Sequence, residues 1–308
     1  MDYFSMENGR LRGNSKAQAM SHLLSDTYPM IYGLFGGFGQ ALVFLSDAIE
    51  LQSAILLMES LVLAAVDWNE AIYKLLKHPQ LSTTADESLP PETIISRIAY
   101  DGRLGGVMKS GPGYHRVSNI LSNENVRRAL VDYIHSLDMR NLPRLLTQMA
   151  RLSVLLLCAA HKPGRPAFDC YLSSLPTFIH SLRVLLDSFQ DHPHKTILVH
   201  GVWLLIILSY VTQLRPIISE GLITATEVSQ EDMSWDRIFS DLQQQPEAVH
   251  GKYRDSSLLR TLRSLQQLGG ALGADERFYL QAAWKLKREW QQWTGLGNDR
   301  EESLNIRL

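Results

Sequence analysis

The chain has 308 residues, a net charge of −2 and a pI of about 6.6. Because this balance creates no field that attracts polyanions, it excludes general nucleic-acid binding and charge-driven attachment to anionic membranes. Hydrophobic residues make up 45% of the chain and charged residues 20%, as in soluble proteins that bury a substantial core. Charge alone therefore does not identify the partner.

Cys158 and Cys170 are the only cysteines, and both stand in apolar surroundings. They exclude a disulfide framework and a cysteine-rich zinc site, and they fit a reducing compartment. The polar N-terminus, MDYFSMENGRLRGNSK, lacks the apolar stretch of a secretory signal. We therefore expect a cytoplasmic protein with a disordered leader over residues 1–16 and one all-helical domain over residues 17–308.

Four glycines, Gly33, Gly36, Gly37 and Gly39, open the first strongly apolar region. Closely spaced glycines either let the backbone wrap a phosphate or let two helices approach closely. No β-branched alternating stretch precedes them, and their spacing matches neither G-x-G-x-x-G nor Gly-Lys-Ser/Thr. The cluster therefore favours helix packing.

Apolar residues recur at intervals of three and four over Ala41–Leu76, which predicts two helices there. Thr83–Pro91 has the composition of a loop, and Pro91 is well placed to start the next helix. Asp101–His115, with the sequence DGRLGGVMKSGPGYH, contains five glycines and one proline and is predicted to be a long loop. Such a loop is a surface connector or a lid over a pocket, and we favour the lid.

The rest of the chain shows helical periodicity between clear boundary signals. Asn123 is predicted to cap a helix through Leu137, and another helix over Leu142–Ala160 ends before Lys162-Pro163-Gly164. The remaining predicted helices are Phe168–Phe189, Thr196–Thr212 after a turn at His192-Pro193-His194, Ser234–Gln245, Asp255–Leu268 and Ala274–Thr294. No stretch combines β-alternation with hairpin turns. We expect an all-α, single multi-helix domain of about nine to eleven helices with an internal apolar pocket.

The longest uncharged stretch, Thr196–Leu214, is at the lower limit of membrane-spanning length. It also carries His200, Ser209 and Gln213. We therefore predict a buried helix and no stable membrane span.

The ten histidines raise the question of a metal site, but none forms an i, i+4 pair or an H-E-x-x-H motif. His192 and His194 flank a proline in a predicted exposed turn. His161 stands at a predicted helix end, where an imidazolium would interact favourably with the helix dipole. His180 and His200 lie in apolar helices, where they either face a shared cavity or are hydrogen-bonded core residues. We expect no metal ligands among them.

Nucleophile motifs are also missing, because there is no G-x-S-x-G elbow and the cysteines lack a partner that would lower a thiol pKa. Tyr28, Tyr32, Tyr100 and Tyr114 are alternative candidates, since a phenol can donate to a developing oxyanion. Tyr28 and Tyr32 are four residues apart and would share a helix face if the helix begins that early. The alternative is that their hydroxyls simply lie at the surface.

Short stretches spread over the chain from about residue 20 carry a family resemblance. They are Tyr28–Gly33, Ala41–Phe44, Leu63–Val66, Asp101–Leu104, Gly111–His115, Lys162–Gly164, Phe168–Leu172, Asp255–Arg263 and the tryptophan-containing last helix. These stretches resemble the questin oxidase-like family of fungal secondary metabolism. That family includes Baeyer–Villiger-type oxidoreductases that act on anthraquinone and aflatoxin-pathway intermediates.

The resemblance implies where functional histidines would lie, and this chain departs from the pattern there. Tyr28 and Tyr32 stand in place of a His-Pro-x-x-His-x-Gly run, and Ser174 in place of the histidine of Asp-Phe-Phe-x-Met-His. Ser257 and Arg260 correspond to the histidine and lysine of Asp-x-His-x-x-Lys. A histidine-rich N-terminal segment of the family has no counterpart before Ala17, and another chain could supply it.

In the family, those histidines look like ligands of a non-haem iron, with the lysine assisting, so the resemblance implies iron or NADPH as cofactor. Because Tyr and Ser stand in place of these histidines, no iron-ligand set remains at these positions, and the cofactor is predicted to be none or unknown. The resemblance implies an oxidoreductase that tailors an aromatic polyketide or meroterpenoid. The alternatives are a metal-free cyclase or rearrangement catalyst in the same pocket, and a non-catalytic metabolite- or partner-binding protein.

The candidate acid–base groups are His115, His180 and His200. The candidate hydrogen-bond donors are Tyr28, Tyr32 and Ser174, while Ser257 and Arg260 rest on the resemblance alone. The expected partner is a hydrophobic small-molecule substrate, with no nucleic acid and no membrane span. A homo-oligomer or a pathway-enzyme partner is a further expectation.

Overall fold

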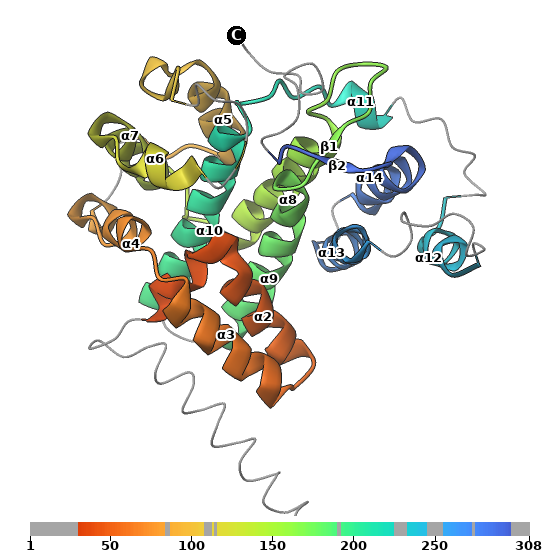
Figure 1. Cartoon of the computed structure of the whole chain (residues 1–308), viewed down its shortest axis with the longest axis horizontal. Helices are drawn as coiled ribbons and strands as arrows, with labels where there is room; N and C mark the ends of the chain where they lie inside the picture. The colour runs from red at the N-terminus through yellow and green to blue at the C-terminus, as the bar shows by residue number, and fades with distance from the viewer. Residues whose placement is uncertain are drawn as a thin grey trace, which may run out of the picture. The chain divides into compact units, whose positions relative to one another are not determined.

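The computed structural model describes residues 30–83, 87–107, 113, 116–189, 192–224, 233–244, 255–272 and 275–296. Helices dominate these ranges (Figure 1), and eleven of them have seven residues or more. The predicted all-α fold of nine to eleven helices is therefore confirmed. The predicted leader over residues 1–16 lies outside the described residues.

The chain forms two compact units, one from Met1–Thr83 and Ser181–Leu205 and the other from Thr84–His180 and Ile206–Leu308. Helices α9 (Leu175–Ser188) and α10 (His192–Thr212) each contribute residues to both units. The chain thus passes between the units inside continuous helices. This connection agrees with the predicted single multi-helix domain.

The described part of the first unit starts with two 3₁₀ turns, η1 (Met30–Phe35) and η2 (Gly37–Gly39). They are followed by α2 (Gln40–Glu50), α3 (Ala54–Val66), α4 (Glu70–Leu76) and the 3₁₀ turn η3 (Pro79–Ser82). The two helices predicted over Ala41–Leu76 are therefore three. One break lies at Gln52, whose φ of 51° is incompatible with a right-handed helix. The other precedes Asn69, whose side chain accepts hydrogen bonds from the N–H groups of Ala71 (3.0 Å) and Ile72 (3.1 Å) and so starts α4.

The glycine cluster packs η1 against α3, as the helix-packing interpretation predicts. A Cβ atom at Gly33 would overlap the carbonyl oxygen of Ala64, and one at Gly36 would overlap that of Asp67. The missing side chains therefore let two backbone segments touch. Ser60 fastens α3 to α2 as well, because its hydroxyl donates to the carbonyl oxygen of Ala41 (2.8 Å).

The second unit contains α5 (Pro91–Tyr100), η4 (Gly102–Leu104), α6 (Val117–Leu121), α7 (Glu124–His135), α8 (Leu142–Cys158), η6 (Leu172–Ser174), α11 (Gly221–Thr224), α12 (Trp235–Gln244), α13 (Ser256–Leu272) and α14 (Glu276–Glu289). Asn123 caps α7 as predicted, since its side chain accepts from the N–H of Asn125 (3.0 Å). Asn141 caps α8 in the same way, accepting from Arg144 (3.0 Å). The short helix α6 was not predicted.

Several predicted boundaries are wrong for identifiable reasons. The helix expected from Phe168 begins only at Leu175, because Phe168–Asp169 (β1) pairs in parallel with Trp293–Thr294 (β2). The same pairing ends α14 before the predicted Thr294, and it adds two short strands to a fold expected to have none. The predicted turn at His192-Pro193-His194 instead opens α10, since proline is favoured in the first turn of a helix.

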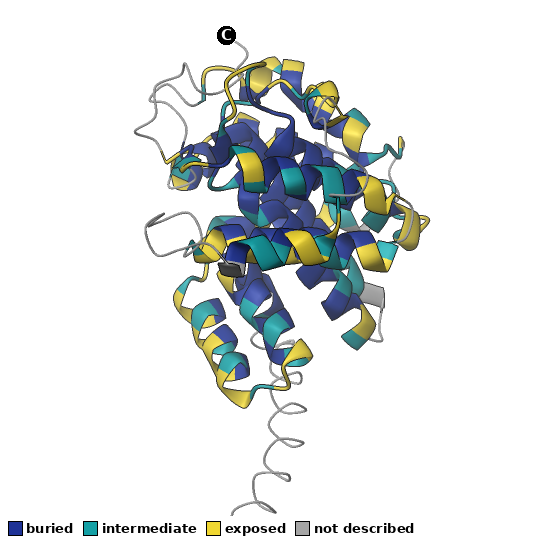
Figure 2. Cartoon of the chain, turned by 90° about the vertical axis from the view of Figure 1, so that its right-hand side faces the viewer, coloured by how far each residue is buried: buried dark blue, intermediate teal, exposed yellow. Residues whose placement is uncertain are grey.

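Buried side chains follow the inner sides of the helices, and exposed residues mark their outer sides (Figure 2). Helix α10 is the extreme case. Among the described residues, its segment His194–Thr212 is long and apolar enough to cross a membrane, but 83% of its most apolar window is buried inside the protein. Such burial is typical of a core helix, and it agrees with the prediction of no stable membrane span.

Candidate functional site

Separate segments of the second unit meet at the C-terminal end of α10. The N–H of Gly113 donates to the carbonyl oxygen of Thr212 (3.2 Å). In the orientation that satisfies both neighbours, the amide nitrogen of Gln213 donates to Asp169 Oδ2 (2.9 Å) and to the carbonyl oxygen of Gly295 (3.2 Å). The end of α10 thus joins two of the family-like stretches, Gly111–His115 and Phe168–Leu172.

The backbone after α10 adopts a conformation that costs free energy. Leu214 and Arg215 have φ angles of 66° and 52°, in the left-handed region that non-glycine residues avoid. Each such residue costs on the order of 1–3 kcal/mol unless its surroundings fix it. Here the N–H of Arg215 donates to the carbonyl oxygen of Tyr210 (2.8 Å), and that of Leu214 to Val211 (3.1 Å). The strain directs the Arg215 side chain back toward the end of α5.

Arg215 is held by one nitrogen and leaves others available. Its Nη1 donates to the carbonyl oxygens of Ile98 (3.3 Å) and Asp101 (3.2 Å). Among the described residues, its Nε and Nη2 have no hydrogen-bond partner. Here a pocket of about 500 Å³ opens, which we call the Arg215 pocket; it is lined by Ala99, Tyr100, Asp101, Gly102, Gly105, Arg215 and Ile217.

The carboxylate of Asp101 fixes the wall of this pocket. It accepts hydrogen bonds from the backbone N–H of Arg103 (2.8 Å), from Arg103 Nε (2.9 Å) and from the hydroxyl of Tyr133 (2.8 Å). Arg103 also donates to Asp132 Oδ2 (2.7 Å), a second carboxylate. Partial burial alone would raise the pKa of Asp101, but the bonds from Arg103 and Tyr133 outweigh it and lower that pKa. Asp101 is therefore a permanently charged support, not a general base.

Substituting Asp101 with asparagine is expected to lower the free energy of unfolding by about 2 kcal/mol, because the guanidinium of Arg103 loses the more buried of its two carboxylate partners. The matched control is D138N. Asp138 also pairs with an arginine, Arg140, but the side chain of that arginine is 78% exposed, so the expected loss is about 1 kcal/mol or less. Urea denaturation of both variants measures the difference. Equal losses would contradict the structural role of Asp101.

The phenol of Tyr133, which is bonded to Asp101, makes the stability of the protein depend on pH. Burial and the hydrogen bond to Asp101 raise the pKa of Tyr133 to about 12. Because the folded state holds this proton more tightly than the unfolded state, the stabilisation is complete below pH ~10 and is lost as pH rises through about 12. Burial also raises the pKa of Tyr279 to about 12.

Absorbance titration of tyrosinate should therefore show a late phase near pH 12, assigned to Tyr133 and Tyr279. The Y133F variant is expected to lose part of that late phase and to keep the earlier phases. A late phase of unchanged amplitude in Y133F would show that the hydroxyl of Tyr133 is not held by Asp101.

The structure places the two predicted tyrosines differently. Tyr32 lies in η1 of the first unit with its side chain buried, packed edge-on against Tyr73 at a ring-centroid distance of 5.2 Å. Burial and the neighbouring Tyr73 raise the pKa of Tyr32. Tyr28 lies outside the described residues, so the predicted shared helix face of Tyr28 and Tyr32 stays a prediction. The prediction of surface hydroxyls does not fit the buried Tyr32.

The remaining family-like residues, Ser174, Ser257 and Arg260, lie on two segments of the second unit that contact each other. Ser174 ends η6, and Ser257 and Arg260 are exposed on the first turns of α13. These two segments touch, because the hydroxyl of Thr261 donates to the carbonyl oxygen of Ser173 (3.2 Å). At these positions two serine hydroxyls stand in place of imidazoles, and a guanidinium stands in place of a lysine. Their catalytic role stays a prediction.

The candidate histidines are dispersed among the elements. His180 in α9 belongs to the second unit and His200 in α10 to the first, and both side chains are buried. His115 lies outside the described residues. His161 differs from its prediction: it lies beyond α8 and is buried, and its Nδ1 contacts the carbonyl oxygen of Lys162 at 2.9 Å. Burial, reinforced by the charge of Lys285, lowers the pKa of His161, so the expected imidazolium is a neutral imidazole.

The donor set can be tested against the iron implied by the resemblance. Among the described residues, no three His, Cys, Asp or Glu side chains lie close enough together to hold a metal ion. The family-like positions Ser174, Ser257 and Arg260 carry hydroxyl and guanidinium groups, which do not serve as a normal iron ligand set. The described part of the chain therefore does not fit an iron site.

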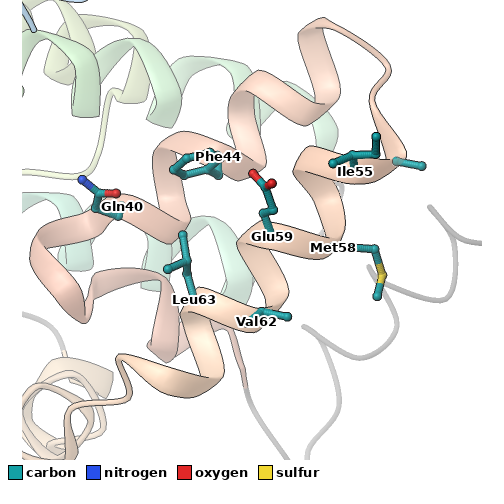
Figure 3. A pocket seen from close by; sticks show the side chains of 8 residues that line it. Gln40, Phe44, Ile55, Met58, Glu59, Val62 and Leu63 are labelled. Atoms are coloured by element: carbon teal, nitrogen blue, oxygen red, sulfur yellow. The ribbon is translucent and has the colours of Figure 1, made fainter. Parts of the chain in front are cut away.

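A second, apolar pocket lies in the first unit between α2 and α3. It is an open groove of about 690 Å³, with Gln40 and Phe44 on the α2 side and Ile55, Met58, Glu59, Val62 and Leu63 on the α3 side (Figure 3). Its volume is typical of ligand sites, but it opens widely to solvent and offers few polar groups. The predicted internal apolar pocket stays a prediction, since both pockets described here reach the surface.

The sequence analysis did not select Arg215 as a candidate site residue. A detectable signal was present, because a cation directly follows an uncharged stretch and stands before Pro216. Its left-handed backbone and its bonds to residues more than a hundred positions earlier could not be detected from local patterns. Tyr100, one of the four candidate phenols, does line the pocket.

Comparison with known proteins agrees with the resemblance found in the sequence. The family model described as "Questin oxidase-like" matches residues 1–265. This range includes the predicted leader and ends inside α13, so the tryptophan-containing last helix lies outside the match. No curated protein matches the chain. The chain belongs to the questin oxidase-like family, which supports an oxidoreductase-like tailoring role at the level of the family.

Proposed function

We propose that this protein tailors a hydrophobic, oxygenated ring metabolite, such as an aromatic polyketide or a meroterpenoid, bound in the Arg215 pocket. The observation that carries the proposal is Arg215, whose guanidinium is fixed through Nη1 while Nε and Nη2 remain available. Arginine remains charged at all physiological pH values and presents its donors as a planar fork. Such a group selects a substrate that carries an enolate, phenolate or carboxylate oxygen.

The remaining lining supports the same class of substrate. Tyr100 is 80% exposed and Ile217 is 37% exposed, so a flat ring can lie against both. Gly102 and Gly105 carry no side chains, and the pocket can therefore approach the backbone closely at that wall. Affinity would then come from ring contacts, and orientation from Arg215.

In the proposed reaction, Arg215 donates to the oxygen on which negative charge develops. A preorganised donor of this kind lowers the barrier because no dipoles need to reorient during the reaction. Asp101 and Tyr133 position Arg215 indirectly, since the carbonyl of Asp101 accepts one of its N–H groups. We propose His115 as the acid–base group; it follows Gly113, which is anchored to Thr212, by two positions.

The family role supports a redox reaction, and an oxidant or NADPH would supply that chemistry when bound. A metal-free cyclisation or rearrangement is the second candidate. It is favoured by the lining itself, which offers an oxyanion donor and no described metal-binding cluster. Non-catalytic binding of a metabolite or pathway enzyme is the third. Cys158 and Cys170 are not joined in a disulfide, which supports the proposal that the protein acts in the cytoplasm.

The test uses purified full-length protein with a hydroxyanthraquinone and, as matched control, the same ring without hydroxyl groups. Binding that needs the hydroxyl groups supports the Arg215 pocket. Turnover is then assayed with and without iron and NADPH. Dependence on either supports the oxidoreductase, cofactor-independent turnover supports the cyclase, and tight binding without turnover supports the carrier. Equal affinity for both rings would refute recognition by Arg215.

A further inference from the structure

The outer face of α3 is unusually apolar for a helix surface. The helix reads AILLMESLVLAAV, a pattern apolar on all sides and typical of a buried helix, yet only Leu57, Ser60 and Ala64 are buried. On the opposite side Ile55 is 72% exposed, Met58 59%, Val62 55% and Val66 74%. Contiguous exposed apolar side chains of this kind mark contact surfaces.

The spacing of these exposed apolar residues indicates which kind of secondary structure can cover them. Ile55, Met58, Val62 and Val66 follow one another at intervals of three and four, so they share one side of α3. Figure 3 shows the first three of them. Ile55, Met58 and Val62, together with Phe44 of α2, border the open groove of about 690 Å³. We call the row of Ile55, Met58, Val62 and Val66 the seam. A groove beside a seam with this spacing fits a second helix that carries apolar residues at the same intervals.

Charge narrows the choice of partner. Glu59 is the only ionisable residue of α3 and lies in the groove. A helix that binds anionic lipid would need basic residues, which α3 lacks. Two copies paired through the middle of this seam would bring two Glu59 carboxylates together, which is unfavourable. The groove therefore fits an apolar helix flanked by basic residues.

We propose that the groove is covered by the N-terminal segment of the same chain, residues 16–28, with the sequence KAQAMSHLLSDTY. Ala17, Met20 and Leu24 recur at intervals of three and four, matching the seam on α3. Lys16, preceded by Arg10 and Arg12, supplies the positive charge that Glu59 requires. This segment lies outside the described residues.

The position of residues 16–28 in the chain and the length of this segment also support it as the occupant of the groove. The segment leads directly into η1 at Met30, and η1 packs on α3 through the close approach of Gly33 to Ala64. A helix over residues 16–28 would be roughly 20 Å long, and the seam from Ile55 to Val66 spans about 16 Å. The C-terminal end of the segment is therefore tethered close to α3, and the segment is long enough to cover the seam. Such tethering makes the contact effectively independent of protein concentration.

Limited trypsin digestion tests the contact, because Lys16 is a cleavage site inside the proposed docked segment, whereas Arg10 and Arg12 precede it. The V62E substitution places a carboxylate in the seam and is expected to accelerate cleavage after Lys16 at least tenfold. The control is S96E, which adds the same charge to an exposed position of α5 and should leave the rate unchanged. An unchanged rate in V62E would overturn the proposal.

Cysteine crosslinking distinguishes this segment from other occupants. An M20C/M58C variant is expected to form an intramolecular crosslink whose yield does not change on tenfold dilution. Single-cysteine variants M20C and M58C control for reaction with Cys158 and Cys170. A crosslink between two chains through M58C would identify a second copy as the occupant, and absence of any new crosslink would show that the segment is elsewhere. Either result overturns the proposal.

Discussion

Replacing Arg215 with alanine is expected to weaken binding of a hydroxyanthraquinone by about 10- to 100-fold, since a charge-assisted hydrogen bond contributes ~1.5–3 kcal/mol. Alanine at this position has the same unfavourable positive φ as arginine, so the substitution adds no new backbone strain. It removes the guanidinium that faces the pocket and leaves the ring contacts of Tyr100 and Ile217. Titration of ligand into wild-type and variant protein gives the affinity ratio.

Two variants separate loss of recognition from general loss of charge. R215K keeps the positive charge but loses the planar fork, so its affinity should lie between those of wild type and R215A. R140A removes an arginine whose side chain is 78% exposed and pairs only at the surface with Asp138, and it should bind like wild type. If R215A bound within twofold of wild type, the ligand would not contact Arg215.

Gly36→Ala is expected to lower the free energy of unfolding by about 3 kcal/mol or more, placing it among the most disruptive single substitutions. The new Cβ would overlap the backbone carbonyl oxygen of Asp67, at the end of α3. A flexible side chain could move aside, but this oxygen belongs to the backbone. Either η1 or α3 must shift, and the packing at Gly33 against Ala64 would shift with it.

The matched control for this substitution is Gly270→Ala in α13. A Cβ at Gly270 meets nothing within 4 Å, and alanine is favoured over glycine inside a helix by up to about 1 kcal/mol. Thermal or urea unfolding should therefore show G270A equal to or more stable than wild type and G36A far less stable. Comparable stability of the two variants would contradict the close contact between η1 and α3.

Local signals in the sequence were sufficient for most helices. Asn123 and Asn141 start α7 and α8 because their side chains accept hydrogen bonds from nearby N–H groups, a property of a few consecutive residues. The strand at Phe168 could not be predicted in this way, since its partner Trp293 is more than a hundred residues away. The apolar periodicity over Ala41–Leu76 predicted that α3 is a helix, but it did not show that one side of this helix is exposed.

The candidate site was less accessible to sequence reasoning. Much of the predicted loop Asp101–His115 lies outside the described residues, and its described start forms the short η4. Its connection to the end of α10 depends on bonds from Arg215 and Gly113. The resemblance selected Tyr32, which belongs to the first unit, and Ser174 and Ser257, which belong to the second. Arg215 acquires its role only through a strained backbone and the convergence of distant segments. Such features are properties of tertiary structure.

The most direct test of the central claim is hydrogen–deuterium exchange of the full-length protein with and without a saturating hydroxyanthraquinone. We predict slower exchange in the peptides that cover Ile98–Gly105 and Thr212–Ile217, which form the Arg215 pocket. Protection confined to α2 and α3, with no change in those two peptides, would place the ligand in the apolar groove and contradict the proposed site.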